Sequence, residues 1–256
     1  MKKGDIFEGV ITDFDFPNKG SLIFEDRKIT IKDTLKGQKV RYMITKRKSG
    51  MAEGRVMEVL EPSPLENVEP KCPHFQNCGG CAYLTMSYEN QLSHKEEMVK
   101  KLLDKAIGSD TDYGWEGIIP SPITEEYRNK MEFTFGDEYK DGPLALGLHK
   151  KGSFHDILKV EECRIIDSDW RKILKYSQEF FLERKVPFYH RMRHEGILRN
   201  LVVRKSKATG EFLINQLVYE NGERYARLGG YCFMASQSAK GYWSPDSVGS
   251  YPVLNP

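Results

Sequence analysis

Four cysteines could together hold an inorganic cofactor. Cys72, Cys78 and Cys81 are separated by five and then two residues, and Cys163 follows far downstream. Three neighbouring thiolates and one distant thiolate supply the four soft sulfur ligands that an iron–sulfur cube needs. Gly79-Gly80 allows the backbone to curl closely around such a group. The spacing therefore favours an iron–sulfur cluster.

Three other interpretations fit the same residues. Tetrahedral zinc also accepts four cysteines but commonly uses two Cys-x-x-Cys pairs, and only Cys78 and Cys81 form one here. A redox disulfide between these two is chemically possible but leaves Cys72 unexplained. Buried thiols without metal are the simplest alternative. His74 lies in the same loop, but we leave it out of the ligand set because loop histidines are usually solvated.

Two groups of basic residues could bind phosphates. Lys46-Arg47-Lys48 is one, and residues 184–207 are the other, with eight Lys or Arg against one acid. Cations near phosphates release counterions, and an aromatic ring offers a face for base stacking. A solvated basic face is the alternative. The predicted RNA-binding residues are Lys46, Arg47, Lys48, Arg128, Lys130, Tyr189, Arg191, Arg193, Arg199 and Arg204.

Composition limits the possibilities without selecting one. The chain has 256 residues, and 39 Lys and Arg against 37 Asp and Glu give a net charge of +2, so bulk charge does not decide for or against RNA. Hydrophobic residues make up 39%, enough for a folded protein. No stretch approaches the roughly 18 apolar residues of a membrane helix. We expect a cytoplasmic protein, without membrane association and monomeric, and its clustered thiols suit a reducing compartment.

The N-terminal segment, 1–62, predicts a small barrel. Strand-like runs lie at 5–12, 21–31, 38–45 and 54–60, and they are separated by turns. About five short strands in this length indicate an OB-like β-barrel. The prolines within 61–65 predict a linker, because they cannot continue a central strand.

Residues 63–222 predict an α+β central domain. Apolar residues recur at helical spacing over 87–107, with Ser87 as N-cap and Gly108 as stop, and again over 167–184. Strands are expected at 130–135, 144–148, 155–160, 198–204 and 211–218. Residues 223–256 have few charges and no apolar period, so we expect a poorly ordered tail there.

These motifs together resemble a known family over residues 4–218. Besides the cysteine loop and Cys163, Tyr127-Arg128-Asn129-Lys130 and Leu198–Arg204 are similar to sequences of the bacterial 23S rRNA (uracil-5-)-methyltransferases. The resemblance implies that the barrel is a TRAM domain and that the central domain holds a 4Fe-4S cluster. Its ligands would be Cys72, Cys78, Cys81 and Cys163. It also implies an RNA substrate, most simply ribosomal RNA.

The family's catalytic machinery has no match here. The resemblance implies a doubly wound C-terminal domain that binds S-adenosylmethionine and carries a nucleophilic cysteine in a Ser-Cys-Asn-Pro motif, and 256 residues leave no room for it after Val218. Cys232 lies in a different context, Gly-Gly-Tyr-Cys-Phe. We therefore expect a truncated RNA-recognition half, inactive alone, with no catalytic residue and no complete methyltransferase domain. The alternative is a free-standing iron–sulfur or zinc RNA-binding module.

Overall fold

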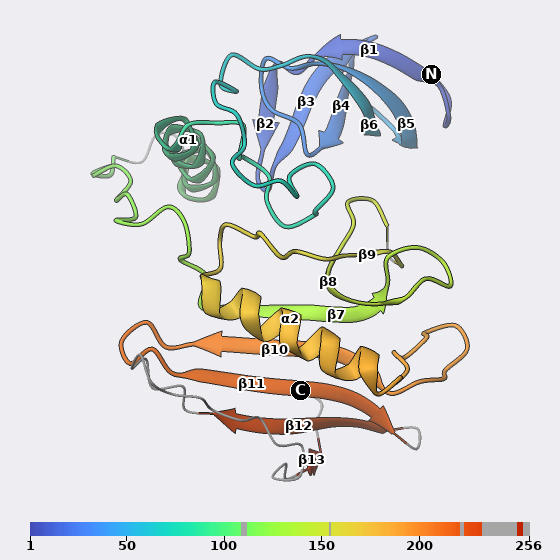
Figure 1. Cartoon of the computed structure of the whole chain (residues 1–256). Coiled ribbons are helices and arrows are strands. Elements are labelled where there is room, and N and C mark those ends of the chain that lie inside the picture. The colour runs from blue at the N-terminus through green and yellow to red at the C-terminus, as the bar shows by residue number, and fades with distance from the viewer. Residues whose placement is uncertain (109–111, 154, 221–222, 232–249, 253–256) are drawn as a thin grey trace. The chain divides into compact units, whose positions relative to one another are not determined.

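The chain divides into two compact units in the computed structural model (Figure 1). Unit 1 comprises Met1–Pro70 and Ala82–Pro122, and unit 2 comprises Lys71–Cys81 and Ile123–Pro256. Among the residues described, no helix is long and apolar enough to cross a lipid bilayer. The structure describes residues 1–108, 112–153, 155–220, 223–231 and 250–252.

Unit 1 contains a six-stranded sheet that curls into a half-barrel. Its strand order is β1-β5-β6-β4-β3-β2, so β1 and β2, which follow each other in the chain, lie at its two edges. The bend between them keeps its backbone bonds, because the Ile11 amide donates to Gln38 at 2.9 Å and the Thr12 amide to Ser21 at 3.0 Å. The strands are β1 (Ile6–Val10), β2 (Asp13–Asp15), β3 (Lys19–Phe24), β4 (Arg27–Lys32), β5 (Lys39–Lys48) and β6 (Met51–Glu61).

The core of the half-barrel follows the predicted alternation. Val40, Tyr42 and Ile44 on β5 are all fully buried, and they meet Ile29 and Ile31 from β4. Neighbouring strands are antiparallel, except that β4 and β6 run parallel, the one such pair among the strands described. The curled β-sheet is thus confirmed, whereas an OB-like barrel with the bounds 1–62 stays a prediction.

Helix α1 (Tyr88–Ile107) begins and ends where its caps were predicted. The Ser87 hydroxyl accepts a hydrogen bond from the Asn90 amide at 3.3 Å, which satisfies one of the free N–H groups of the first turn. Gly108 ends the helix with a positive φ of 88°, a conformation that costs glycine little.

Helix α1 belongs to unit 1, although the predicted boundary at 62/63 assigned it to the central domain. The rings of His94 and Phe14 lie 4.4 Å apart between centroids. Lys101 lies 4.0 Å above the Phe14 ring and forms an ion pair with Asp13 at 2.6 Å. These contacts join residues far apart in the sequence, which the local sequence pattern does not reveal. The division by contacts therefore differs from the predicted one.

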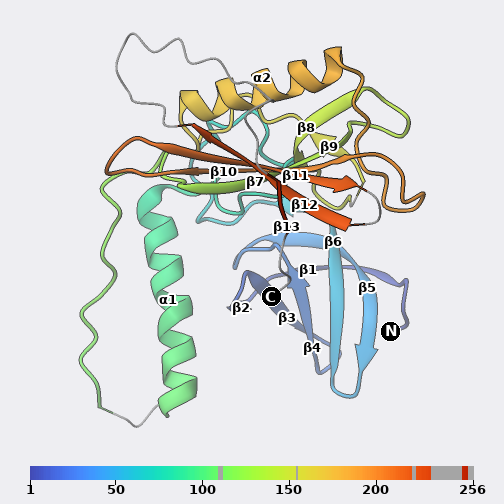
Figure 2. The same cartoon turned by 90° about the horizontal axis from the view of Figure 1, so that it is seen from below.

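Unit 2 is built on a seven-stranded antiparallel sheet, with helix α2 across one face (Figure 2). The strand order is β13-β12-β11-β10-β7-β8-β9. All five predicted strands occur in this sheet, although β9 is much shorter than its predicted range. The elements are β7 (Lys130–Asp137), β8 (Leu144–His149), β9 (Ile157–Leu158), α2 (Ser168–Glu183), β10 (Leu198–Lys205), β11 (Phe212–Glu220), β12 (Glu223–Tyr231) and β13 (Ser250–Pro252).

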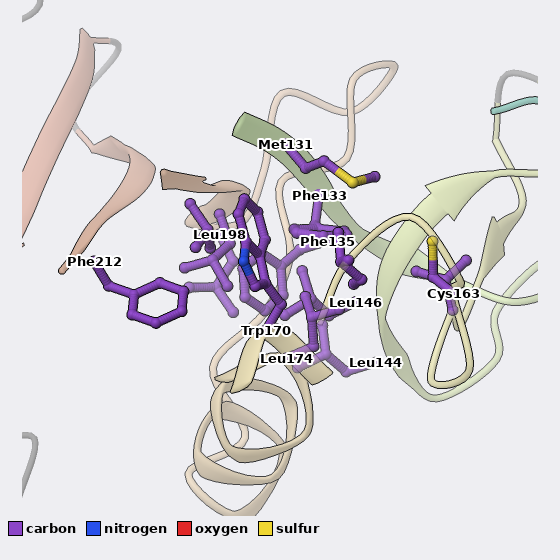
Figure 3. Close-up of a cluster of buried hydrophobic side chains, with 14 of the residues drawn as sticks. Met131, Phe133, Phe135, Leu144, Leu146, Cys163, Trp170, Leu174, Leu198 and Phe212 are labelled. Atoms are coloured by element: carbon purple, nitrogen blue, oxygen red, sulfur yellow. The ribbon is translucent and has the colours of Figure 1, made fainter. Parts of the chain in front are cut away.

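Trp170 from α2 is the centre of the unit 2 core. It is fully buried and makes edge contacts with Phe133 and Phe212, at 6.5 and 6.1 Å between ring centroids. Figure 3 shows Phe212 and Cys163 on opposite sides of this cluster. Cys163 is only 7% exposed and belongs to the same cluster. The fourth predicted ligand is therefore anchored in the core of unit 2.

The segment 223–256 is not uniformly a tail. Residues 223–231 form β12, which pairs with β11 from Glu220↔Glu223 to Phe212↔Tyr231, and residues 250–252 form β13. Pairing of β12 covers the edge that β11 would otherwise expose. This correction applies to the two strands alone, since residues 232–249 and 253–256, including Cys232, lie outside the described residues.

Candidate functional site

The four predicted cysteine ligands all lie in unit 2. Cys72, Cys78 and Cys81 come from the loop Lys71–Cys81, and Cys163 comes from the segment between β9 and α2. Burial, followed by the charges of Cys163, Cys78 and Cys72, raises the pKa of the Cys81 thiol to about 11. The thiols are thus close enough for each charge to act on the others.

Cys78 and Cys163 show the same electrostatic pattern. Burial raises the pKa of Cys78 and of Cys163, and the charge of Cys72 adds to both effects. One interaction opposes the shift at Cys78, whose sulfur accepts a hydrogen bond from the Gly80 amide at 3.3 Å. Since the raised pKa values keep the thiols protonated at neutral pH, a metal that binds here must displace protons.

Backbone bonds give the cysteine loop a fixed shape. The Phe75 amide donates to the Cys72 carbonyl at 3.1 Å, and the Cys78 amide donates to the His74 carbonyl at 2.8 Å. The loop also pairs with the end of β8, through an isolated antiparallel bridge between Cys78 and Lys150. Between Cys78 and Cys81 the chain turns back on itself, because the Gly80 amide donates to the Cys78 sulfur. The two adjacent glycines suit this turn.

The segment that carries Cys163 is bonded to two other parts of unit 2. On one side, the Glu162 amide donates to His74 Nε2 of the cysteine loop at 3.2 Å. On the other side, the Arg164 carbonyl accepts from the Glu126 amide at 2.9 Å, and the next carbonyl accepts from the Arg128 amide at 2.9 Å. The half-buried His74 therefore has a role that sequence reasoning missed, as a hydrogen-bond acceptor.

The residue types suit a cluster, although no closed metal site is visible. In the part of the chain that the structure describes, no three His, Cys, Asp or Glu side chains form a group that could hold a metal ion. Four ligands of one zinc ion converge at about 2.3 Å from the metal, whereas a cube spreads its four sulfur ligands over separate corners. The observation that bears on the fit is the donor set itself: four soft thiols, mostly buried, that affect each other's charge.

Arg128 lies beside the thiols. Its positive charge acts against the raised pKa of Cys81, and its side-chain Nε donates to the Lys130 carbonyl at 3.0 Å. Burial and the nearby Cys81 raise the pKa of the adjacent Tyr127. Sequence reasoning placed Arg128 on an RNA surface, and the structure adds that it compensates thiolate charge.

The predicted RNA-binding residues are divided between the two units. Lys46, Arg47 and Lys48 are at the end of β5 in unit 1, where Lys46 is 3.9 Å from Glu53 and Arg47 donates to the Met1 carbonyl at 3.3 Å. The others belong to unit 2, so the predicted surface consists of two separate basic groups. The exposed members of the second group are Arg128, Lys130, Arg191, Arg193 and Arg204.

Tyr189 is held by contacts within unit 2. Its ring centroid lies 4.3 Å from that of Tyr219, the Arg199 guanidinium lies 5.2 Å from the ring, and its hydroxyl is 2.9 Å from His194 Nδ1. Protein side chains therefore already pack against this ring, and base stacking on it stays a prediction. These contacts join residues from three segments, so the sequence pattern alone does not show them.

Arg204 and its neighbour Lys205 have different surroundings on β10. Arg204 is exposed and pairs in register with Lys130 of β7, which places two predicted cations side by side on the sheet. Lys205 is largely buried and forms an ion pair with Asp167 at 2.6 Å. Alternation along the strand thus separates a surface cation from a structural one.

The described part of the chain thus combines a curled six-stranded half-barrel with an antiparallel α+β unit that carries the four predicted cysteine ligands. No family model matches it. The chain is 45% identical over 215 residues to an uncharacterized RNA methyltransferase of Caldanaerobacter subterraneus subsp. tengcongensis, covering 84% of this chain and 47% of the relative. It is 34% identical over 229 residues to an uncharacterized RNA methyltransferase of Chlorobaculum tepidum, with the same coverage.

The chain spans about half the length of these curated relatives. A solved structure, that of Pyrococcus abyssi tRNA (uracil-54, C5)-methyltransferase in complex with S-adenosyl-L-homocysteine, aligns with a TM-score of 0.58 and 22% identity. The alignment covers 84% of this chain and 46% of that one. At this identity the likeness shows a shared fold. The two relatives are RNA methyltransferases by name.

Proposed function

We propose that the chain is the RNA-recognition part of an S-adenosylmethionine-dependent RNA (uracil-5-)-methyltransferase that acts on ribosomal RNA in the cytoplasm. The 45% identity to a protein named as an RNA methyltransferase supports the family. In this proposal the described residues include no catalytic or donor-binding residue, so the chain alone binds RNA as a monomer without methylating it. The half-barrel of unit 1 is the family's TRAM domain.

The observation that carries this proposal is the set of four thiols in unit 2. Cys72, Cys78, Cys81 and Cys163 would hold a 4Fe-4S cluster, and four mutually interacting, mostly buried thiols support this assignment. A bound cluster with four cysteine ligands leaves no iron site open to substrate, so its contribution is structural. The chain's own part is to bring the loop Lys71–Cys81 and Cys163 together.

RNA binding is assigned to the two basic groups. On unit 1 it involves Lys46, Arg47 and Lys48; the side chain of Lys46 is 57% exposed, and its nearest carboxylate oxygen, of Glu53, lies 3.9 Å away. The remaining residues of the proposed surface are on unit 2, and they are Arg128, Lys130, Tyr189, Arg191, Arg193, Arg199 and Arg204. Cations that neutralise phosphates release counterions, so affinity should fall steeply with salt.

The first experiment tests the cofactor. The chain is purified without oxygen, and iron, sulfide and zinc are measured per chain together with the visible spectrum. Iron and sulfide with the broad absorption of thiolate-ligated clusters would support the proposal. Zinc without sulfide would instead favour the zinc RNA-binding module, and absence of both metals would contradict the site.

The second experiment tests the substrate. Binding of a ribosomal RNA fragment, a transfer RNA and a DNA duplex is compared at several salt concentrations. The proposal expects RNA to bind more tightly than duplex DNA, with ribosomal RNA preferred, and it expects a steep salt dependence. Equal affinity for RNA and duplex DNA, or affinity independent of salt, would contradict RNA recognition.

A further inference from the structure

Glu125 lies between the two segments that carry the thiols. One carboxylate oxygen, Oε2, is 2.7 Å from Arg164 Nη2, and the other, Oε1, is 3.3 Å from Lys71 Nζ. Lys71 precedes Cys72, and Arg164 follows Cys163. A single carboxylate thus bridges Lys71, the residue before Cys72, and Arg164, the residue after Cys163.

His74 makes a second connection on the opposite side of Cys163. Its Nε2 accepts a hydrogen bond from the Glu162 amide at 3.2 Å, so this nitrogen carries the lone pair and Nδ1 the proton. The His74 carbonyl accepts from the Cys78 amide at 2.8 Å. The residue therefore bonds to the backbone beside Cys163 and, within its own loop, to the backbone of Cys78.

We propose that Glu125 and His74 are positioning residues that hold Cys163 against the cysteine loop before a cofactor binds. The inference rests on the proposed iron–sulfur site. Glu125 pairs with the side chain of Arg164, directly after Cys163, and His74 accepts from the Glu162 amide, directly before it, so the two contacts lie on either side of the thiol. The geometry assigns both residues to the ligand frame and not to the ligand set.

Such contacts are needed because bringing the four cysteines together disfavours their charged thiolate forms. Burial disfavours the thiolates of Cys78, Cys81 and Cys163, and the charges of neighbouring cysteines add to this effect. At Cys81 the positive charge of Arg128 offsets part of this repulsion. Groups that support metal ligands from behind change metal affinity by about 10- to 100-fold when they are removed.

The first test measures cluster retention by the full chain. Iron-loaded protein is mixed with a chelator, and the loss of visible absorption is timed for Glu125→Gln, His74→Phe and His74→Gln. The first two are expected to lose iron about tenfold faster than the unmodified chain. The His74→Gln chain should retain iron nearly as well, because its amide oxygen can accept the same bond from Glu162.

A matched control comes from the neighbouring glutamate. Glu126 pairs with Arg171 at 3.1 Å, and within the described part of the chain its side chain bonds to no residue beside a thiol. Glu126→Gln is therefore expected to leave the rate unchanged. Equal acceleration by Glu126→Gln and Glu125→Gln, or failure of His74→Gln to restore retention, would show that these residues support the fold in general and would overturn the inference.

The second test needs no iron, and so separates this inference from the proposed function. In iron-free chains that carry Cys72→Ser, Cys78→Ser and Cys232→Ser, only Cys81 and Cys163 remain, and dibromobimane becomes fluorescent when it bridges two thiols. Adding Glu125→Gln or His74→Phe should lower the bridging yield several-fold. Bridging that stays unchanged overturns the inference even if the chain binds iron. Reduced bridging in a chain that binds no iron supports it and contradicts the proposed cluster.

Discussion

Replacing Asp167 by alanine removes two interactions of unit 2 at once. Asp167 is the N-cap of α2, and its Oδ1 accepts from the amides of Asp169 and Trp170 at 3.1 and 3.4 Å. Its Oδ2 pairs with Lys205 at 2.6 Å, where the two side chains are only 14% and 15% exposed. We expect this substitution to destabilise unit 2 far more than an ordinary surface change.

The two losses can be estimated separately. Loss of an N-cap costs about 1 kcal/mol. Leaving a buried charge without its partner costs about 3 to 5 kcal/mol, but Lys205 keeps Asp169 at 3.6 Å and some solvent, so about 1 to 2 kcal/mol is the better estimate here. The total is about 2 to 3 kcal/mol. Asp167→Asn keeps an oxygen at the cap and should lose the second part alone.

Hydrogen exchange of the α2 amides measures this effect in the full chain. Protection over residues 168–183 should fall most in Asp167→Ala and less in Asp167→Asn. Asp169→Ala is the control, because Asp169 is 50% exposed and its contacts with lysines are worth less than about 1 kcal/mol. Equal loss of protection in Asp167→Ala and Asp169→Ala would refute the assignment of a partly buried ion pair at the cap.

Three further predictions concern pH, metal and RNA. Burial lowers the pKa of His94, so below about pH 6.5 the unfolded chain takes up a proton that the folded unit 1 does not. The free energy of unfolding should therefore be highest above that pH and fall below it. Thermal unfolding of His94→Gln should depend less on pH. Cys163→Ser should abolish iron binding, measured per chain, whereas Cys232→Ser should not change it. Replacing Lys46, Arg47 and Lys48 by glutamine should reduce the slope of log affinity against log salt by about 2, and an unchanged slope would remove this group from the RNA surface.

Local signals in the sequence were enough to predict both helices and most strands, but not β12 and β13. Ser87 and Gly108 marked the ends of α1 because capping depends on residues within one turn. The alternation of Val40, Tyr42 and Ile44 predicted a half-buried strand, and each of these side chains is fully buried. Where one face of a strand or helix packs on the core, the period of the apolar residues records that packing.

Contacts between distant residues were not predictable in this way. The assignment of α1 to unit 1 depends on the pairs Lys101–Asp13 and His94–Phe14, which no local pattern encodes. Tyr189 was predicted as a stacking ring from its basic neighbours, yet Tyr219 packs against it from another strand. The role of Glu125 was missed for the same reason, since one of its partners lies far before it in the chain and the other far after it.

The spacing of the cysteines gains its meaning from the path of the chain. After Pro70 the chain leaves unit 1, contributes Lys71–Cys81 to unit 2, and returns to unit 1 at Ala82. A group bound by Cys72 and Cys163 would close a loop of about 90 residues, and a cross-link of that length stabilises the folded state by about 4 to 5 kcal/mol if it acts as a disulfide does. Contacts of individually small energy, at Glu125 and His74, join the two segments, and a bound group would make their association more durable.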